Sequence, residues 1–95
     1  MTLEWDENKR QSNFLKHGLD FADAADILDS RYRMDRAIVR GNEVRIQSFS
    51  YVADRLAVLT LVHLERNESV RIVSFRYASE EESEVYYEWL QQENQ

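Results

Sequence analysis

The spacing of apolar residues changes twice along the chain, and this double change limits the folds open to it. Residues 7–28 carry apolar side chains about 3.6 positions apart, as helices do. Between residues 37 and 77 the period changes to the two of strands, except that residues 56–65 are nearly continuous in apolar residues, as in a central strand covered on both faces. Residues 79–90 return to the helical period. Proline is absent and no linker-like tract interrupts the pattern. The sequence therefore predicts one α+β domain over residues 1–95.

The N-terminal part predicts two helices. Thr2–Trp5 gives a weak strand signal, and Asp6 is a suitable N-cap for a helix over residues 7–17 that Gly18 ends. Asp20 is placed to cap a second helix. The apolar stripe of that second helix consists of Phe21, Ala24, Ala25 and Leu28.

The remaining segments predict a meander of strands and a closing helix. Strands are expected at residues 37–40, 43–50, 56–65 and 70–77, and Gly41-Asn42 suits a tight hairpin turn. The C-terminal helix begins at a capping box, Ser79-x-x-Glu82, and its apolar stripe contains Val85, Tyr86, Trp89 and Leu90. The predicted fold is a small antiparallel sheet of three to five strands with two N-terminal helices and one C-terminal helix.

Composition excludes several classes of site. Cysteine is absent, which removes disulfides and thiolate metal sites and fits a cytoplasmic protein. The two histidines, His17 and His63, are far apart in sequence, so a histidine-rich metal site is not expected. No apolar run approaches the length of a membrane span. We expect neither a metal nor another cofactor.

Charge is distributed in three blocks, although the net charge is −6. Residues 1–30 hold three basic and seven acidic residues, and residues 79–95 hold six glutamates and no basic residue. Residues 31–78 hold nine arginines against five acidic residues. Because phosphate contacts require basic side chains, this central block is the part of the chain suited to bind nucleic acid.

The strand pattern predicts a face that gathers polar residues. If helices cover one face of the sheet, the other is open. Pairing of Glu65 with Val70 then places His63, Glu65, Ser74 and Arg76 together on one face. A shift of one residue in that register would place Arg71 and Tyr77 there instead.

Several motifs resemble those of the BrnT toxins, which belong to the RelE-like ribonuclease superfamily. The first is W-D-x-x-K-x-x-x-N-x-x-K-H-G, which the chain matches from Trp5 to Gly18 and extends with Phe21. An arginine that opens a strand follows at Arg45, and a Glu-Arg pair that ends the next strand is Glu65-Arg66. The last motif, R-[IV]-[IV]-S-x-R-x-A-[ST], matches residues 71–79. The resemblance covers nearly the whole chain, but the C-terminal helix is acidic where many such toxins have a basic one, and Tyr77 replaces a basic residue or proline.

The resemblance implies a function, a fold and a partner. It implies a type II toxin with a RelE-like fold, a metal-independent endoribonuclease that cleaves RNA and arrests translation. It further implies a BrnA-like antitoxin with a ribbon-helix-helix DNA-binding part, through which the complex represses its own promoter.

Metal-independent RNA cleavage needs a base for the 2′-hydroxyl, an acid for the leaving oxygen and positive charge at the phosphorus. Arginine suits the last role, because its planar donors grip two phosphate oxygens. The predicted catalytic residues are Arg76, Arg45, Arg66, Glu65 and His63. The predicted RNA-binding residues are Arg71, Lys16, His17, Ser74 and Tyr77.

Structural roles compete with each of these assignments. A strand arginine is commonly a solvated or ion-paired side chain, and a histidine on an apolar strand is commonly a satisfied core residue. Lys16 and His17 also suit the C-terminal end of a helix dipole. At the level of function, the chain could instead be an inactive toxin-fold subunit that acts as a co-repressor, or a non-catalytic RNA- or protein-binding module.

Overall fold

The computed structural model describes residues 1–93. Within this range short N-terminal helices precede a meander of strands, and one longer helix follows it. The elements in chain order are β1 (Thr2–Glu4), α1 (Glu7–His17), the 3-10 turn η1 (Phe21–Asp23), α2 (Ala25–Leu28), β2 (Met34–Arg40), β3 (Glu43–Val52), the 3-10 turn η2 (Ala53–Arg55), β4 (Ala57–Arg66), β5 (Ser69–Tyr77) and α3 (Glu80–Glu93). No helix in the described range is long and apolar enough to cross a membrane.

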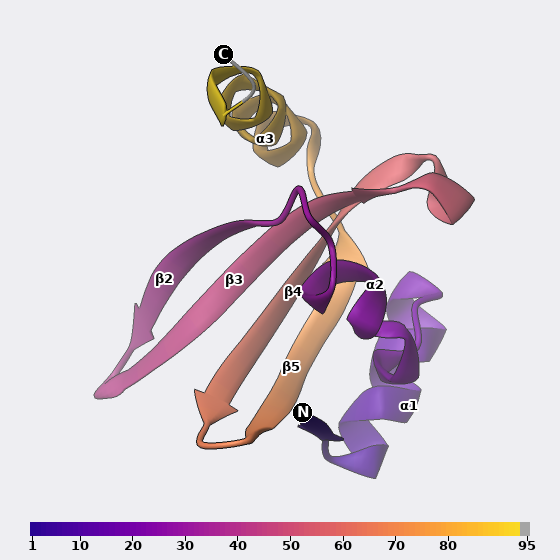
Figure 1. The fold of residues 1–95 in the computed structure, drawn as a ribbon. Coiled ribbons are helices and arrows are strands. Elements are labelled where there is room, and N and C mark those ends of the chain that lie inside the picture. The colour runs from indigo at the N-terminus through magenta and orange to yellow at the C-terminus, as the bar shows by residue number, and fades with distance from the viewer. Residues whose placement is uncertain (94–95) are drawn as a thin grey trace.

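The sheet has five strands in the order β1-β5-β4-β3-β2 (Figure 1). The β2–β3, β3–β4 and β4–β5 pairs are antiparallel, as predicted, and each follows from a short connection. β1 pairs with β5 in parallel, so the prediction of an entirely antiparallel sheet is wrong and the sheet is mixed. Local sequence pattern does not indicate this pairing, because β1 is only three residues long and its partner Ser69 begins β5, at the far end of the meander.

α1 has the limits that its capping residues predict. The Asp6 side chain accepts hydrogen bonds from the backbone N–H groups of Asn8 and Lys9, and Gly18 ends the helix with a left-handed φ of 70°. The helix buries Asn13, whose side-chain amide donates to the Phe75 carbonyl and whose oxygen accepts from the Phe75 N–H. Asn13 thus satisfies the edge of β5 beyond the reach of β1, as a neighbouring strand would.

The second predicted helix is shorter and more tightly wound than its sequence pattern indicates. Asp20 accepts a hydrogen bond from the Ala22 N–H as a cap, but residues 21–23 form a 3-10 turn before α2 begins at Ala25. The 3-10 turn has about three residues per turn, which rotates the residues that follow. Ala25 is consequently exposed, and Ile27 takes its expected place in the core.

The long hairpins have the predicted turns and one irregularity. Gly41, with φ of 60°, links β2 to β3 as a primed turn requires, and Glu65 pairs with Val70 as predicted. Beyond Ile72 the ladder contains a β-bulge. His63 pairs with Ile72, whereas Val62 pairs with Ser74, so Val73 is an extra residue without a partner.

Helices pack on both faces of the sheet, contrary to the expectation that one face stays open. α1, η1 and α2 cover one face, which we call the helix face, and pack against Leu59, Leu61, Val70, Ile72 and Phe75. α3 lies on the opposite side (Figure 1), where Tyr86, Trp89 and Leu90 pack over Met34, Phe49 and Val58. The Tyr86 hydroxyl donates to the Tyr32 carbonyl at 2.7 Å and fixes α3 at one end of its face. α3 packs over only this part of the face.

Candidate nucleic-acid interface

The sheet face on which α3 packs gathers most of the arginines of the central basic block. Cross-strand partners project to the same side of a sheet, so the registers assign each side chain to a face. Arg36 lies opposite Gln47, and Gln47 lies opposite Val62. Arg76 lies opposite Thr60, and Arg71 opposite Leu64. The arginines assigned in this way are Arg36, Arg40, Arg45, Arg66, Arg71 and Arg76. We call this surface the arginine face.

The β-bulge makes this gathering possible. Arg71 and Arg76 are five positions apart, so in a regular strand they would point to opposite faces. The extra residue Val73 restores the alternation, and both arginines project from the arginine face. The same shift keeps Ile72 and Phe75, three positions apart, in the core on the helix face.

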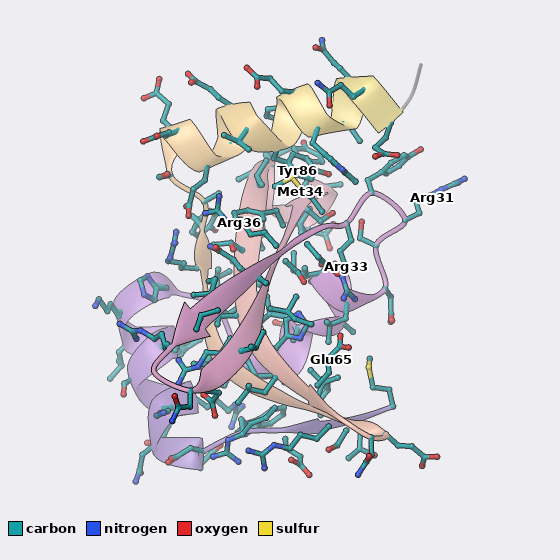
Figure 2. All side chains as sticks on the ribbon, turned by 90° about the vertical axis from the view of Figure 1, so that its left-hand side faces the viewer. Arg31, Arg33, Met34, Arg36, Glu65 and Tyr86 are labelled. Atoms are coloured by element: carbon teal, nitrogen blue, oxygen red, sulfur yellow. The ribbon has the colours of Figure 1, made fainter. Side chains whose placement is uncertain are left out.

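A compact cluster of polar groups forms where α3 meets the arginine face. Both guanidinium Nη atoms of Arg76 donate to the Glu82 carboxylate, at 2.8 and 3.0 Å. The Gln47 side-chain amide donates to Glu82 at 3.3 Å and to Thr60 at 3.1 Å, and Arg36 Nη2 lies 3.7 Å from Glu82 Oε2. The hydrogen bonds from Arg76 lower the pKa of Glu82 to about 2. Figure 2 shows Arg36 on the sheet below α3, with Met34 and Tyr86 between the helix and the strands.

The end of α1 adds two basic or titratable side chains beside this cluster. Lys16 and His17 occupy the last turn of α1, next to the Asn13 contact with β5. Burial lowers the pKa of His17, and the charges of Lys16 and Arg76 add to this effect. Because Asn13 joins α1 to the backbone of Phe75, the last turn of α1 lies at the edge of β5 near Arg76, and the lowered pKa of His17 leaves its imidazole neutral at pH 7.

A second polar cluster lies on the helix face. Ser48 donates its hydroxyl proton to Asp35 at 2.6 Å, so the 2.8 Å contact with His63 has Nε2–H of the histidine as its donor. His63 is fully buried, and its Nδ1 has no hydrogen-bond partner among the described residues. Glu65 Oε1 lies 3.9 Å from this nitrogen, and Arg33 contacts both Asp35 and Glu65 (Figure 2 labels Arg33 and Glu65). Burial lowers the pKa of His63, and the charge of Arg33 adds to the effect.

The predicted catalytic residues consequently fall on two faces. Placement of His63 and Glu65 with Ser74 and Arg76 is wrong, because the bulge at Val73 moves the last two residues to the arginine face. The alternative register is also wrong, since it would have placed Arg71 and Tyr77 together on one face. Arg71 does lie on the arginine face, but Tyr77 pairs with Leu59 of the helix face.

Arg45 and Arg66 lie on the arginine face but away from Arg76. Arg45 donates to Glu43 at 2.9 Å next to the β2–β3 turn, and Arg66 ends β4 at the opposite end of the β4–β5 hairpin from Arg76. Arg71 forms no ion pair within residues 1–93. In the same range no group of three histidine, cysteine or acidic residues is arranged to hold a metal ion.

Sequence reasoning missed three members of the cluster around Arg76, namely Arg36, Gln47 and Glu82. Glu82 was interpreted only as part of a capping box, which it does form with Ser79. The spacing of Ile72 and Phe75 was the available signal for the bulge, because two core residues three positions apart cannot share a face of a regular strand. Arg36 and Gln47 carried no such signal, since only the β2–β3 pairing brings them together.

Two comparisons with known proteins bear on this surface. A family model described as "Ribonuclease toxin, BrnT, of type II toxin-antitoxin system" matches residues 5–82. The match includes α1, the whole meander and Glu82. No significant match to a curated protein was found.

Proposed function

Because the chain belongs to the BrnT family of ribonuclease toxins from type II toxin-antitoxin systems, we propose that it is a metal-independent endoribonuclease that cuts RNA on its arginine face. Residues 1–95 act as one toxin domain with a RelE-like fold in the cytoplasm. Cleavage of messenger RNA arrests translation. The observation that carries the proposal is the gathering of six arginines on one sheet face of an acidic protein.

Arg76 is the proposed electrophilic residue. Its guanidinium already binds one carboxylate through two parallel hydrogen bonds, which is the geometry that a phosphate oxygen pair requires. Bound to the scissile phosphate, Arg76 would stabilise the charge that develops on the phosphorane. Arg71 and Ser74 project from the same face of β5 as Arg76. They would contact the RNA backbone next to the scissile phosphate.

His17 is the proposed proton acceptor for the 2′-hydroxyl. It is held at the end of α1 beside Arg76, and its lowered pKa leaves the imidazole neutral at pH 7. Lys16 contributes positive charge at the same place. His63 and Glu65 belong to the helix face, so the sheet separates them from a phosphate on Arg76. We assign them to the structural polar cluster with Ser48.

The test is cleavage of a labelled structured RNA by the purified protein in EDTA. We expect the wild type to cut and Arg76→Ala to lose at least about a hundredfold in rate, which is the usual cost of one such donor. His17→Gln should lose about a hundredfold and flatten the pH profile. Arg55→Ala, in the exposed η2 turn, controls for the loss of an arginine and should cut normally. Equal cutting by wild type and Arg76→Ala, with both folded by circular dichroism, would refute the proposal.

The proposed partner is a BrnA-like antitoxin with a ribbon-helix-helix DNA-binding part. Membership in a type II family implies an antitoxin. Glu80, Glu81, Glu84 and Glu88 on α3 lack a basic neighbour in their own helix and suit a basic partner segment. Reversal of Glu81, Glu84 and Glu88 to lysine should weaken the complex with that antitoxin, and unchanged affinity would remove α3 from the interface.

One observation favours a second candidate function, that of an inactive co-repressor. Glu82 occupies the donors of Arg76, which an active enzyme would need free for substrate. Expression without the antitoxin separates the two functions. Growth arrest that the antitoxin relieves indicates an active toxin, whereas normal growth with promoter repression by the complex indicates a co-repressor.

A further inference from the structure

The carboxylate of Glu82 receives more donors than an ion pair needs. Arg76 donates to it twice, at 2.8 and 3.0 Å. The Gln47 amide donates at 3.3 Å and the Ser79 backbone N–H at 2.8 Å, while Arg36 Nη2 lies 3.7 Å away. Two guanidinium groups, an amide and a backbone N–H thus converge on two oxygen atoms, and this is the donor set of a site for an oxyanion.

The donors are held in place independently of Glu82. Gln47 is buried and donates to Thr60 as well, and its oxygen accepts from Arg36 Nε at 3.0 Å. The Arg36 guanidinium also stacks over the Phe49 ring at 5.0 Å. Arg76 Nη1 has a further contact with the Tyr77 carbonyl at 3.2 Å. Removal of the Glu82 carboxylate would therefore leave a preformed site.

Glu82 has room to leave without moving α3. A surface pocket of about 380 Å³ adjoins the cluster and is lined by Arg36, Arg76, Ser79, Glu81, Glu82 and Val85. The helix is anchored to the sheet by Tyr86, Trp89 and Leu90, which pack with Met34, Phe49 and Val58. Rotation of the Glu82 side chain towards this pocket would vacate the donors.

We propose that Arg36, Gln47, Arg76 and the Ser79 N–H form a binding site for one RNA phosphodiester, and that Glu82 is an internal competitor that fills this site in the free protein. The identity of the ligand as RNA rests on the proposed function. Occupation by a charged carboxylate at neutral pH means that substrate binds only the fraction of molecules in which Glu82 has swung away. The apparent association constant for RNA is the intrinsic constant multiplied by that fraction.

The test compares how tightly the wild type and its variants bind a fluorescent 2′-O-methyl oligoribonucleotide. This ligand lacks the attacking hydroxyl and is not cleaved. Glu82→Gln removes the charge, and the Ser79 hydroxyl still accepts from the backbone N–H of residue 82, so the start of α3 should be retained. Glu93→Gln is the matched control, because it makes the same charge change at the other end of the same helix, on an exposed residue outside this pocket. Fluorescence anisotropy gives the dissociation constants.

We expect Glu82→Gln to bind the oligonucleotide at least about tenfold more tightly than the wild type. This is the gain expected if the site is vacant in about a tenth or less of the wild-type molecules. Glu93→Gln should change affinity less than about twofold. Adding Arg36→Ala to Glu82→Gln should abolish the gain. Equal changes in the two single variants, or weaker binding by Glu82→Gln, would overturn the proposal and make Glu82 a residue that holds Arg76 in place.

A second measurement uses the wild-type protein and needs no substitution. The side-chain amide resonances of Gln47 and the guanidinium resonances of Arg36 should shift when the same oligonucleotide is added, and resonances of Gln11 on α1 should not. Shifts absent at both Gln47 and Arg36 under saturation would overturn the proposal. Binding with this pattern but without RNA cleavage would refute the ribonuclease activity alone, whereas cleavage without the pattern would refute the competitor site alone.

Discussion

At the scale of single residues, Asn13 shows how one side chain can replace a strand. Its amide pairs with both backbone groups of Phe75 and also donates to the Leu19 carbonyl at 3.1 Å. Asn13→Ala leaves these buried groups without partners, and each such group costs about 1–3 kcal/mol. We expect the free energy of unfolding, measured with urea, to fall by about 2–4 kcal/mol.

Asn8→Ala is the control for this prediction. Asn8 lies on the same helix but is exposed, and only its backbone takes part in hydrogen bonds. Its replacement should change stability by less than about 0.5 kcal/mol. Similar losses of unfolding free energy in the two variants would show that the contact of Asn13 with β5 does not stabilise the fold.

His63 makes stability depend on pH in a defined direction. Burial holds its pKa below the ordinary value of 6.5, so the unfolded chain binds a proton more readily than the folded protein. This contribution to stability is fully present above about pH 6.5 and is lost as the pH falls from there towards the pKa of the folded state. Urea unfolding at pH 7.5, 6.5 and 5.5 should show the decline, and His63→Gln should reduce its slope. An equal slope in the variant would assign the decline to other groups.

At the scale of elements, the β5 bulge separates what the sequence predicts from what it does not. The four strands of the meander, the Gly41 turn and the Glu65–Val70 pairing follow from local signals and are confirmed, although β2 begins earlier than predicted, at Met34, and β3 ends later, at Val52. The assignment of side chains to faces fails only beyond Val73, because it assumes that side chains alternate strictly and that each residue of β5 has one partner on β4. Local rules therefore predicted the strands, while one inserted residue decided which arginines share a surface.

Removal of the inserted residue gives a specific prediction. Deletion of Val73 lets Ile72 and Ser74 pair with His63 and Val62 in a regular ladder, and every other side chain keeps its face. We expect a cooperatively folded protein within about 2 kcal/mol of the wild type by urea unfolding. Deletion of Val62 on the partner strand turns the residues beyond it to the wrong face and should prevent cooperative unfolding. A folded Val62 deletion with an unfolded Val73 deletion would contradict the described register.

The β3–β4 connection contains an element that glycine should improve. Leu56 ends η2 with a left-handed φ of 52° and an exposed side chain, a conformation that costs a non-glycine residue about 1–2 kcal/mol. Leu56→Gly removes this cost, although glycine also increases the conformational entropy of the unfolded chain and so offsets part of the gain. We expect the free energy of unfolding to rise by about 0.5–1 kcal/mol and Tm to rise with it. Leu15→Gly, an equally exposed leucine within α1, should instead lose about 1 kcal/mol.

At the scale of the whole molecule, long-range arrangement was the hardest feature to predict. The class of fold and the presence of both N-terminal helical segments and α3 follow from periodicity and capping. The parallel β1 and the packing of α3 on the arginine face do not, because each depends on contacts between distant segments. The candidate site was predicted through Arg76 and lacked Arg36, Gln47 and Glu82 for the same reason.

The arginine face should give RNA binding a measurable salt dependence. Each phosphate neutralised on a single strand lowers the logarithm of the affinity by about 0.7 per tenfold rise in salt. Arg71→Ala should reduce the slope by about that amount for the 2′-O-methyl oligonucleotide. Arg55→Ala, away from the face, should leave the slope unchanged. Identical slopes in all three proteins would place RNA elsewhere.

Because α3 packs at one end of the arginine face, the glutamates of residues 79–93 border the arginines of residues 31–78, in a protein whose net charge is −6. At separations greater than roughly 8 Å in physiological salt, little of the field of these charges reaches an approaching polyanion. At closer range most orientations repel it, and only an encounter that presents the arginine face first is attractive. The protein thus discriminates by orientation, and it avoids the indiscriminate capture of nucleic acid that a uniformly basic ribonuclease would suffer.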